Sequence, residues 1–169
     1  MTEIQRYRVL DSFSGIEIRE YEPHSLVTMQ TSGNFNQAGY NAFGYLAGYI
    51  SGRNQANQSI AMTSPVIQKP ESGGYSVSFV MPADMRAEQV PAPIGSNLKI
   101  EHESTKRIAT IRFSGMATGE LFEDKGQKLL SVLKARSIQP IGEVFFARYN
   151  GPWTPPFLRR NEALVEIAA

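Results

Sequence analysis

One order of elements occurs twice along this 169-residue chain, and that repetition constrains the fold more than any single motif. Each copy has two segments with strand-like apolar residues, one with apolar residues at helical spacing, and two more strand-like segments. In the first copy, a helix is predicted from about 34 to 52, with Ser32 or Asn34 as its N-terminal cap, between strands at 16–21, 24–31, 59–68 and 75–81. In the second, a helix capped by Thr118 is predicted at about 118–136, between strands at 98–103, 107–114, 142–149 and 162–167.

The repeated order predicts the fold class. Pairs of strands on either side of a single helix favour an α+β protein with an antiparallel sheet. We expect one domain, a distorted antiparallel barrel or sheet with two helices, built from two pseudo-symmetric halves at about 1–82 and 95–169. We expect the helices to be related by a two-fold axis. A cleft between the halves would be the natural position for a ligand.

The first predicted helix is rich in glycine and tyrosine. Three internal glycines each weaken a helix by about 1 kcal/mol relative to alanine, which suggests close packing or close approach of a ligand. Tyr45, Tyr49 and Arg53 recur every four residues, beside the apolar stripe that should face the core. Such a stripe suits a large flat ligand with acidic groups, or it covers the edge of a sheet.

Two proline-containing segments stand out after the first helix. In IAMTSPV (60–66), Pro65 predicts an edge strand or a bulge, and Met62 within that strand is either a core residue or the wall of an apolar pocket. In ARYNGPWTPPFLRRNE (147–162), three prolines restrict the backbone around the only tryptophan. We expect Trp153 and Phe157 to touch a ligand, and Arg159, Arg160 and Glu162 to tie the loop to the sheet.

Composition excludes several classes of function. There is no cysteine, which excludes disulfides and thiolate chemistry, and a net charge of +1 is too small to indicate nucleic acid or an anionic membrane as the main partner. The two histidines, His24 and His102, lack metal-site spacing, and no nucleophile elbow or phosphate-binding loop occurs. We therefore expect no catalytic residues and no metal site. The start has no apolar h-region and no segment is long and apolar enough to span a membrane, so we expect a cytoplasmic protein.

Several motifs together resemble the SOUL haem-binding protein family. The most specific are IAMTSPV and PWTPPFLRRNE (152–162), and the match runs in order over almost the whole chain. The others are EIREYEP (17–23), AFGYLAGYISGRN (42–54), VSFVMP (77–82), IRFSG (111–115) and YNG (149–151). The resemblance implies a distorted antiparallel barrel with two helices, similar to the gyrase-inhibitor-like effector-binding domains.

The resemblance also implies a ligand and a site. It implies that haem or a related tetrapyrrole binds in an apolar cleft lined by Tyr45, Tyr49, Arg53, Met62, Trp153 and Phe157. Some family members carry histidine just after the EIR motif, where this chain has Glu20, so haem is expected without a strong axial histidine. Two alternatives stay open: an enzyme acting on tetrapyrroles, and a binder of other lipophilic effectors. A cationic effector would need a buried carboxylate such as Glu143, Glu162 or Glu166.

Overall fold

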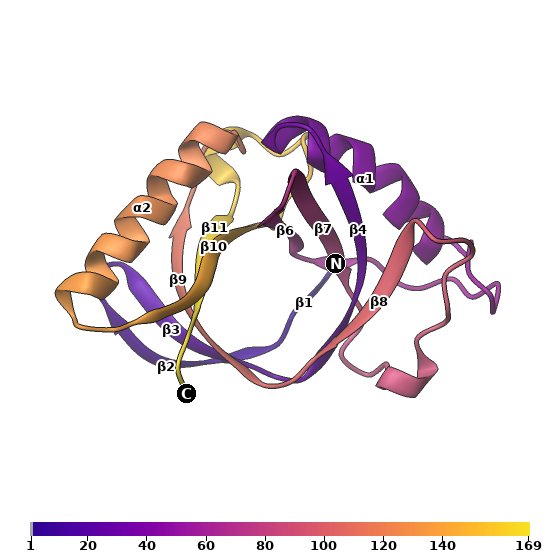
Figure 1. The fold of residues 1–169 in the computed structure, drawn as a ribbon, viewed down its shortest axis with the longest axis horizontal. Coiled ribbons are helices and arrows are strands. Elements are labelled where there is room, and N and C mark those ends of the chain that lie inside the picture. The colour runs from indigo at the N-terminus through magenta and orange to yellow at the C-terminus, as the bar shows by residue number, and fades with distance from the viewer. Residues whose placement is uncertain (1) are drawn as a thin grey trace. The chain divides into compact units, whose positions relative to one another are not determined.

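The computed structural model describes residues 2–169, which form two compact units (Figure 1). Unit 1 comprises residues up to Gln5 together with Pro23–Ser104, and unit 2 comprises Arg6–Glu22 together with Thr105–Ala169. Each unit contains one antiparallel sheet and one long helix, which confirms the predicted α+β class.

Unit 1 has the strand order β6-β7-β4-β8, with α1 packed over β4 and β7. A separate parallel pair, β1 and β5, completes the unit. The bounds are β1 Glu3–Ile4, β4 His24–Ser32, α1 Phe35–Ile50, β5 Thr63–Ser64, β6 Val66–Glu71, β7 Gly74–Val80, the short helix η1 Ala87–Gln89 and β8 Leu98–Glu103.

Unit 2 has the strand order β2-β3-β9-β11-β10, with α2 packed over β9, β11 and β10. The bounds are β2 Tyr7–Phe13, β3 Ile16–Tyr21, β9 Lys106–Phe113, α2 Gly119–Ala135, β10 Pro140–Arg148, the short helix η2 Pro156–Leu158 and β11 Asn161–Ile167. Within the described residues neither unit's sheet returns to its first strand, so neither forms a closed barrel on its own.

The two sheets share one connectivity. The order β8-β4-β7-β6 in unit 1 matches β3-β9-β11-β10 in unit 2, and each helix follows the second strand of its set. The expected repetition is therefore present, with one difference. The strand β3, which precedes β4 in the chain, belongs to unit 2 and pairs with β9. The strand β8, which precedes β9, belongs to unit 1 and pairs with β4. The units thus differ from the expected halves 1–82 and 95–169.

Local sequence explains both helices. Asn34 begins α1 with a capping box, because its side chain accepts from the amide of Gln37 at 2.9 Å and its own amide donates to the Gln37 side chain at 3.2 Å. The buried stripe of α1 packs on β4 and β7, and includes Ala42 and Leu46. Thr118 caps α2, as predicted, by accepting from the amide of Leu121.

The strand predicted at 59–68 is wrong in its first part. Met62 lies in an irregular segment before β5, not in a strand. Pro65, which follows a cis Ser64–Pro65 peptide bond, separates β5 from β6. A proline cannot donate to a strand ladder, so the ladder is interrupted here, in agreement with the expectation from Pro65.

Candidate functional site

The solvent-facing side of α1 carries no charge. No Asp, Glu, Lys or Arg lies anywhere in this helix, although most surface helices have a charged outer face. Tyr40, Gly44 and Gly48 follow one line along it at four-residue spacing, and Tyr45 lies beside Gly48. Tyr40 and Tyr45 are both exposed, and a side chain added at Gly44 would meet nothing within 4 Å. The backbone of α1 is therefore open to close approach from solvent.

Arg53 supplies a positive charge at one end of this surface. Its side chain lies against Gly48, where an added Cβ would be 3.4 Å from Cδ and 3.7 Å from Nη1 of the arginine. The amide of Arg53 donates to the carbonyl of Gly48 at 3.0 Å, which fixes the start of the side chain. We call Tyr40, Gly44, Tyr45, Gly48 and Arg53 the glycine face.

Tyr49 faces the opposite way. Its ring is buried in the core of unit 1, and its hydroxyl donates to the carbonyl of Pro91 at 2.7 Å. Burial raises the pKa of this hydroxyl to about 12, so it stays protonated at neutral pH. Tyr49 thus anchors α1 to the core of unit 1. Met62 is partly exposed in the segment before β5.

Asn54 holds the segment that follows Arg53. Its side-chain amide is fully buried and makes four hydrogen bonds. It donates to the carbonyls of Tyr49 and Gln58, and it accepts from the amides of Ala56 and Gln58. Sequence reasoning missed this residue, because a single asparagine after a helix looks like any turn residue.

In unit 2, the loop between β10 and β11 presents its apolar side chains to solvent. Trp153 is 84% exposed and Phe157 is 75% exposed. The indole lies over Gly151, where an added Cβ would come within 2.7 Å of ring atom Cε2. Arg159 donates to the carbonyls of Thr154 at 2.8 Å and Pro152 at 2.9 Å, which holds the loop closed from within.

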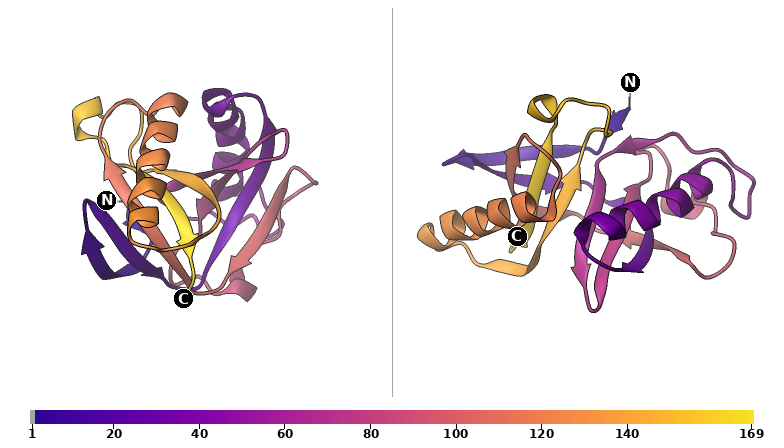
Figure 2. Two further views of the ribbon diagram at one scale, coloured as in Figure 1. Left: turned by 60° about the vertical axis from the view of Figure 1, so that its left-hand side comes forward. Right: turned by 90° about the horizontal axis from the view of Figure 1, so that it is seen from above.

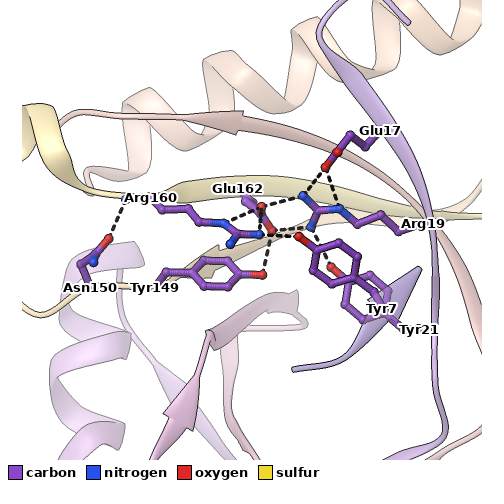
Figure 3. Close-up of polar contacts among 8 residues, drawn as sticks. All are labelled: Tyr7, Glu17, Arg19, Tyr21, Tyr149, Asn150, Arg160 and Glu162. Atoms are coloured by element: carbon purple, nitrogen blue, oxygen red, sulfur yellow. Dashed lines mark hydrogen bonds and ion pairs between the residues drawn. The ribbon is translucent and has the colours of Figure 1, made fainter. Parts of the chain in front are cut away.

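A buried ionic network surrounds Glu162 on β11, the strand that follows this loop (Figure 3). Glu162 on β11 is fully buried and accepts from both guanidinium groups around it. Arg19 on β3 bonds both of its carboxylate oxygens at 2.9 Å, and Arg160 bonds one of them at 2.9 and 3.1 Å. Tyr149 donates a further bond at 3.0 Å. Arg160 and Glu162 therefore connect the loop to the strands, as expected, whereas Arg159 bonds carbonyls within the loop.

Aromatic rings and a second carboxylate complete the network. Arg19, only 1% exposed, also donates to Glu17 at 2.6 Å and to the hydroxyl of Tyr21 at 2.9 Å. Its guanidinium lies 4.1 Å from the ring centre of Tyr7, whose hydroxyl accepts from Arg160. Arg19 lies on the face of β3 opposite to Ile16 and Ile18, and the burial of its side chain is not visible from the alternating pattern of residues 16–21.

The network determines the protonation of its members. Burial alone would raise the pKa of Glu162, but hydrogen bonds from Arg19 and the charges of Arg19 and Arg160 outweigh it and hold that pKa below 4.5. Burial raises the pKa of the Tyr149 hydroxyl well above its ordinary value, and the adjacent Glu162 adds to this. Glu162 is therefore ionised and neutralised by two arginines, so it offers no free charge to a cation.

One of the two histidines, His102, contacts a hydroxyl group on a neighbouring strand. Nδ1 of His102 lies 2.8 Å from the hydroxyl of Ser25, at the pairing of β4 with β8. No group of three or more metal-binding His, Asp or Glu side chains occurs among the residues described. Among residues 2–169, no helix is both long enough and apolar enough to cross a membrane.

A family model described as "SOUL heme-binding protein" matches residues 2–166. The chain belongs to the SOUL family. The SOUL chain is 27% identical to mouse heme-binding protein 2 over 157 residues, which cover 86% of this chain and 74% of that protein.

Solved structures share the fold of this SOUL protein at low identity. The EcmrR C-terminal domain has a TM-score of 0.65 at 8% identity, covering 96% of this chain and 98% of that one. The protein SAV2435, solved bound to tetraphenylphosphonium, has a TM-score of 0.51 at 10% identity, covering 97% and 94%. These likenesses agree with the expected relation to effector-binding domains in fold.

Proposed function

We propose that this protein binds haem or a related tetrapyrrole without catalysing its conversion, as a carrier, buffer or sensor. Membership of the SOUL family and the heme-binding names of its relatives support this. The observation that carries the proposal is the glycine face: an open, uncharged helix surface in unit 1, flanked by tyrosine and ending at an arginine.

Each part of the glycine face suits a part of the ligand. A porphyrin is broad, flat and apolar, and the open backbone at Gly44 lets a flat ring approach the helix closely. The ring of Tyr45 supplies a flat apolar surface beside it. Arg53 can pair with a propionate, as a planar guanidinium does with carboxylates. Met62, Trp153 and Phe157, which the sequence predicted as ligand contacts, stay predictions.

We propose that no single histidine is required. His102 already has a hydroxyl partner, and the glycine face itself contains no histidine. The variants His24→Ala and His102→Ala should each keep haem affinity within about threefold, because apolar burial supplies most of the binding free energy. Titration followed at the Soret band measures this. If either variant loses a six-coordinate spectrum and binds about a hundredfold more weakly, axial ligation by that histidine replaces our proposal.

The decisive experiment is a titration with three ligands of different charge. We expect the protein to bind haem, to bind haem dimethyl ester more weakly, and not to bind tetraphenylphosphonium. A lipophilic cation would need an unpaired buried carboxylate, but Glu162 is neutralised, Glu166 pairs with Lys106 at 3.6 Å and Glu143 is exposed. Tight binding of the cation and none of haem would favour the effector-binding alternative.

Arg53→Ala should weaken haem binding by about tenfold in low salt and by less in high salt, since an exposed ion pair is screened. It should leave binding of the dimethyl ester unchanged, because the ester has no carboxylate. An equal loss for both ligands would mean that Arg53 acts through packing, not through charge.

Substitutions at Gly44 separate stability from binding. Gly44→Ala should stabilise the protein by about 1 kcal/mol, because the position is helical and the space is open. Gly44→Leu should fold equally well yet weaken haem binding by more than about tenfold, since its side chain stands where the ring would lie. Thermal melting and haem titration of both variants measure this. Unchanged haem affinity in Gly44→Leu would remove the glycine face from the site.

A further inference from the structure

We propose that the loop from Tyr149 to Leu158 is a membrane-docking element that inserts its apolar side chains into the interface of an anionic bilayer. This goes beyond the proposed haem binding and does not depend on it. The loop projects from the ends of β10 and β11 that it joins (Figure 2). It presents Trp153, Phe157 and Leu158 to solvent, the last 63% exposed.

The loop is uncharged where it is exposed. No Asp, Glu, Lys, Arg or His occurs from Tyr149 to Leu158. The two arginines that follow are both engaged at its base, Arg159 with loop carbonyls and Arg160 with Glu162. Tryptophan and phenylalanine on an uncharged, protruding segment are the residues that settle at the boundary between lipid headgroups and acyl chains.

The main chain of the loop is adapted to a medium that cannot form hydrogen bonds. Prolines at 152, 155 and 156 have no amide hydrogen to satisfy. The carbonyl of Gly151 accepts from the amide of Thr154, and that of Pro155 accepts from the amide of Leu158. The carbonyl of Pro156 accepts from Gly115 and Arg159, and those of Pro152 and Thr154 accept from the Arg159 side chain. These bonds lower the cost of losing water at the carbonyls of Gly151, Pro152, Thr154, Pro155 and Pro156.

The loop also holds its shape before it binds. Its base is fixed by the amide of Arg160, which donates to the Asn150 side chain at 2.6 Å, and by the amide of Tyr149, which donates to the Arg160 carbonyl at 3.1 Å. A stiff loop gives up little conformational entropy when it docks. Its three prolines cannot donate to a strand ladder, which argues against addition of a partner strand.

The charge of unit 2 favours an anionic surface. Unit 2 carries more basic than acidic residues, whereas unit 1 carries more acidic than basic residues. Attraction of the basic unit to phosphatidylserine would add to the insertion of the loop, and it would weaken as salt is added.

The single tryptophan makes the test direct, because Trp153 is the only indole and lies on the loop. Purified full-length protein without haem is mixed with phosphatidylcholine vesicles with or without phosphatidylserine. We expect the emission to shift to shorter wavelength with the anionic vesicles, and brominated lipid to quench it. Unshifted, unquenched emission together with no co-sedimentation overturns the proposal.

Variants locate the contact. Phe157→Ala with Leu158→Ala keeps the fluorescent probe and should weaken vesicle binding by about tenfold or more, from the apolar surface lost. Tyr40→Ala, which removes a similarly exposed ring from α1, should leave vesicle binding unchanged. Equal binding by the double variant and the native protein would overturn the proposal. If the double variant melts early, quenching of the native protein by brominated lipid decides.

Discussion

Replacing Arg19 by alanine is expected to lower the free energy of unfolding by about 3–5 kcal/mol. The arginine is almost completely buried and donates two hydrogen bonds to the buried carboxylate of Glu162. Without it, one arginine and one tyrosine would be left to satisfy that charge in a buried site. Urea denaturation followed by far-UV circular dichroism measures the loss.

The matched control is Arg8→Ala. Arg8 also belongs to unit 2 and pairs with Glu20 at 2.9 Å, but its side chain is 72% exposed. An exposed pair contributes about 0–1 kcal/mol, so this variant should remain close to the native stability. If Arg19→Ala is no more costly than Arg8→Ala, the network does not stabilise the fold as we infer.

The same network sets the expected response to acid. The folded-state pKa of Glu162 lies below its ordinary value of 4.5. Its stabilisation is therefore fully present above the unfolded-state pKa and is lost as the pH falls through the lower folded-state pKa. In Arg19→Ala the folded-state pKa of Glu162 should rise towards its unfolded-state value, so Glu162 should contribute a smaller loss of stability on acidification than in the native protein.

Asn54→Ala is expected to cost about 2–4 kcal/mol, because it removes one buried side chain that bonds four backbone groups. The Tyr49 carbonyl would keep the Gly52 amide as a donor, whereas the other carbonyl and both amides would lose the Asn54 side chain as a partner. Asn54→Asp keeps the acceptor for both amides but loses both donations, so its stability should be intermediate. Asn41→Ala, on the exposed side of α1, is the control and should change stability by less than about 0.5 kcal/mol.

The variant Asn54→Ala also tests whether the turn after Arg53 affects haem binding. Asn54 fixes the turn directly after Arg53, so the loss of this turn should free the guanidinium from its place against Gly48. Haem affinity should then fall as much in Asn54→Ala as in Arg53→Ala, at a temperature where both variants are folded. A normal haem affinity in folded Asn54→Ala would show that the position of Arg53 does not depend on the turn.

The sequence was sufficient for the elements with regular periodicity. Both helices follow from the spacing of apolar residues and from capping chemistry. Asn34 was one of two proposed caps of α1, and Thr118 was the proposed cap of α2. The strand β2 was missed because most of its residues are exposed at the edge of a sheet, which weakens alternation. The exchange of β3 and β8 was missed because local patterns do not show which distant strand a strand will pair with.

The candidate site was less predictable than the fold. The spacing of Tyr45, Tyr49 and Arg53 suggested one stripe, but a four-residue step drifts around the helix and the structure buries Tyr49 while it exposes Tyr45. The internal glycines lower the stability of α1. The open surface at Gly44 suggests what this loss of stability allows, which is close approach of a ligand to the helix backbone. The Arg19–Glu162 pair joins residues 143 positions apart, a separation at which single-sequence patterns carry no information.

The exchange of first strands has a consequence for how such a chain could arise. A polypeptide holding one repeat would lack the edge strand of its own sheet, since β8 completes the sheet of β4 and β3 completes that of β9. It could complete that sheet only by trading this strand with a second copy, as domain-swapped dimers do. Duplication and fusion of a gene for such a dimer would turn an exchange of strands between two molecules into an exchange within one chain. Each repeat would then depend on the other for one strand of its sheet.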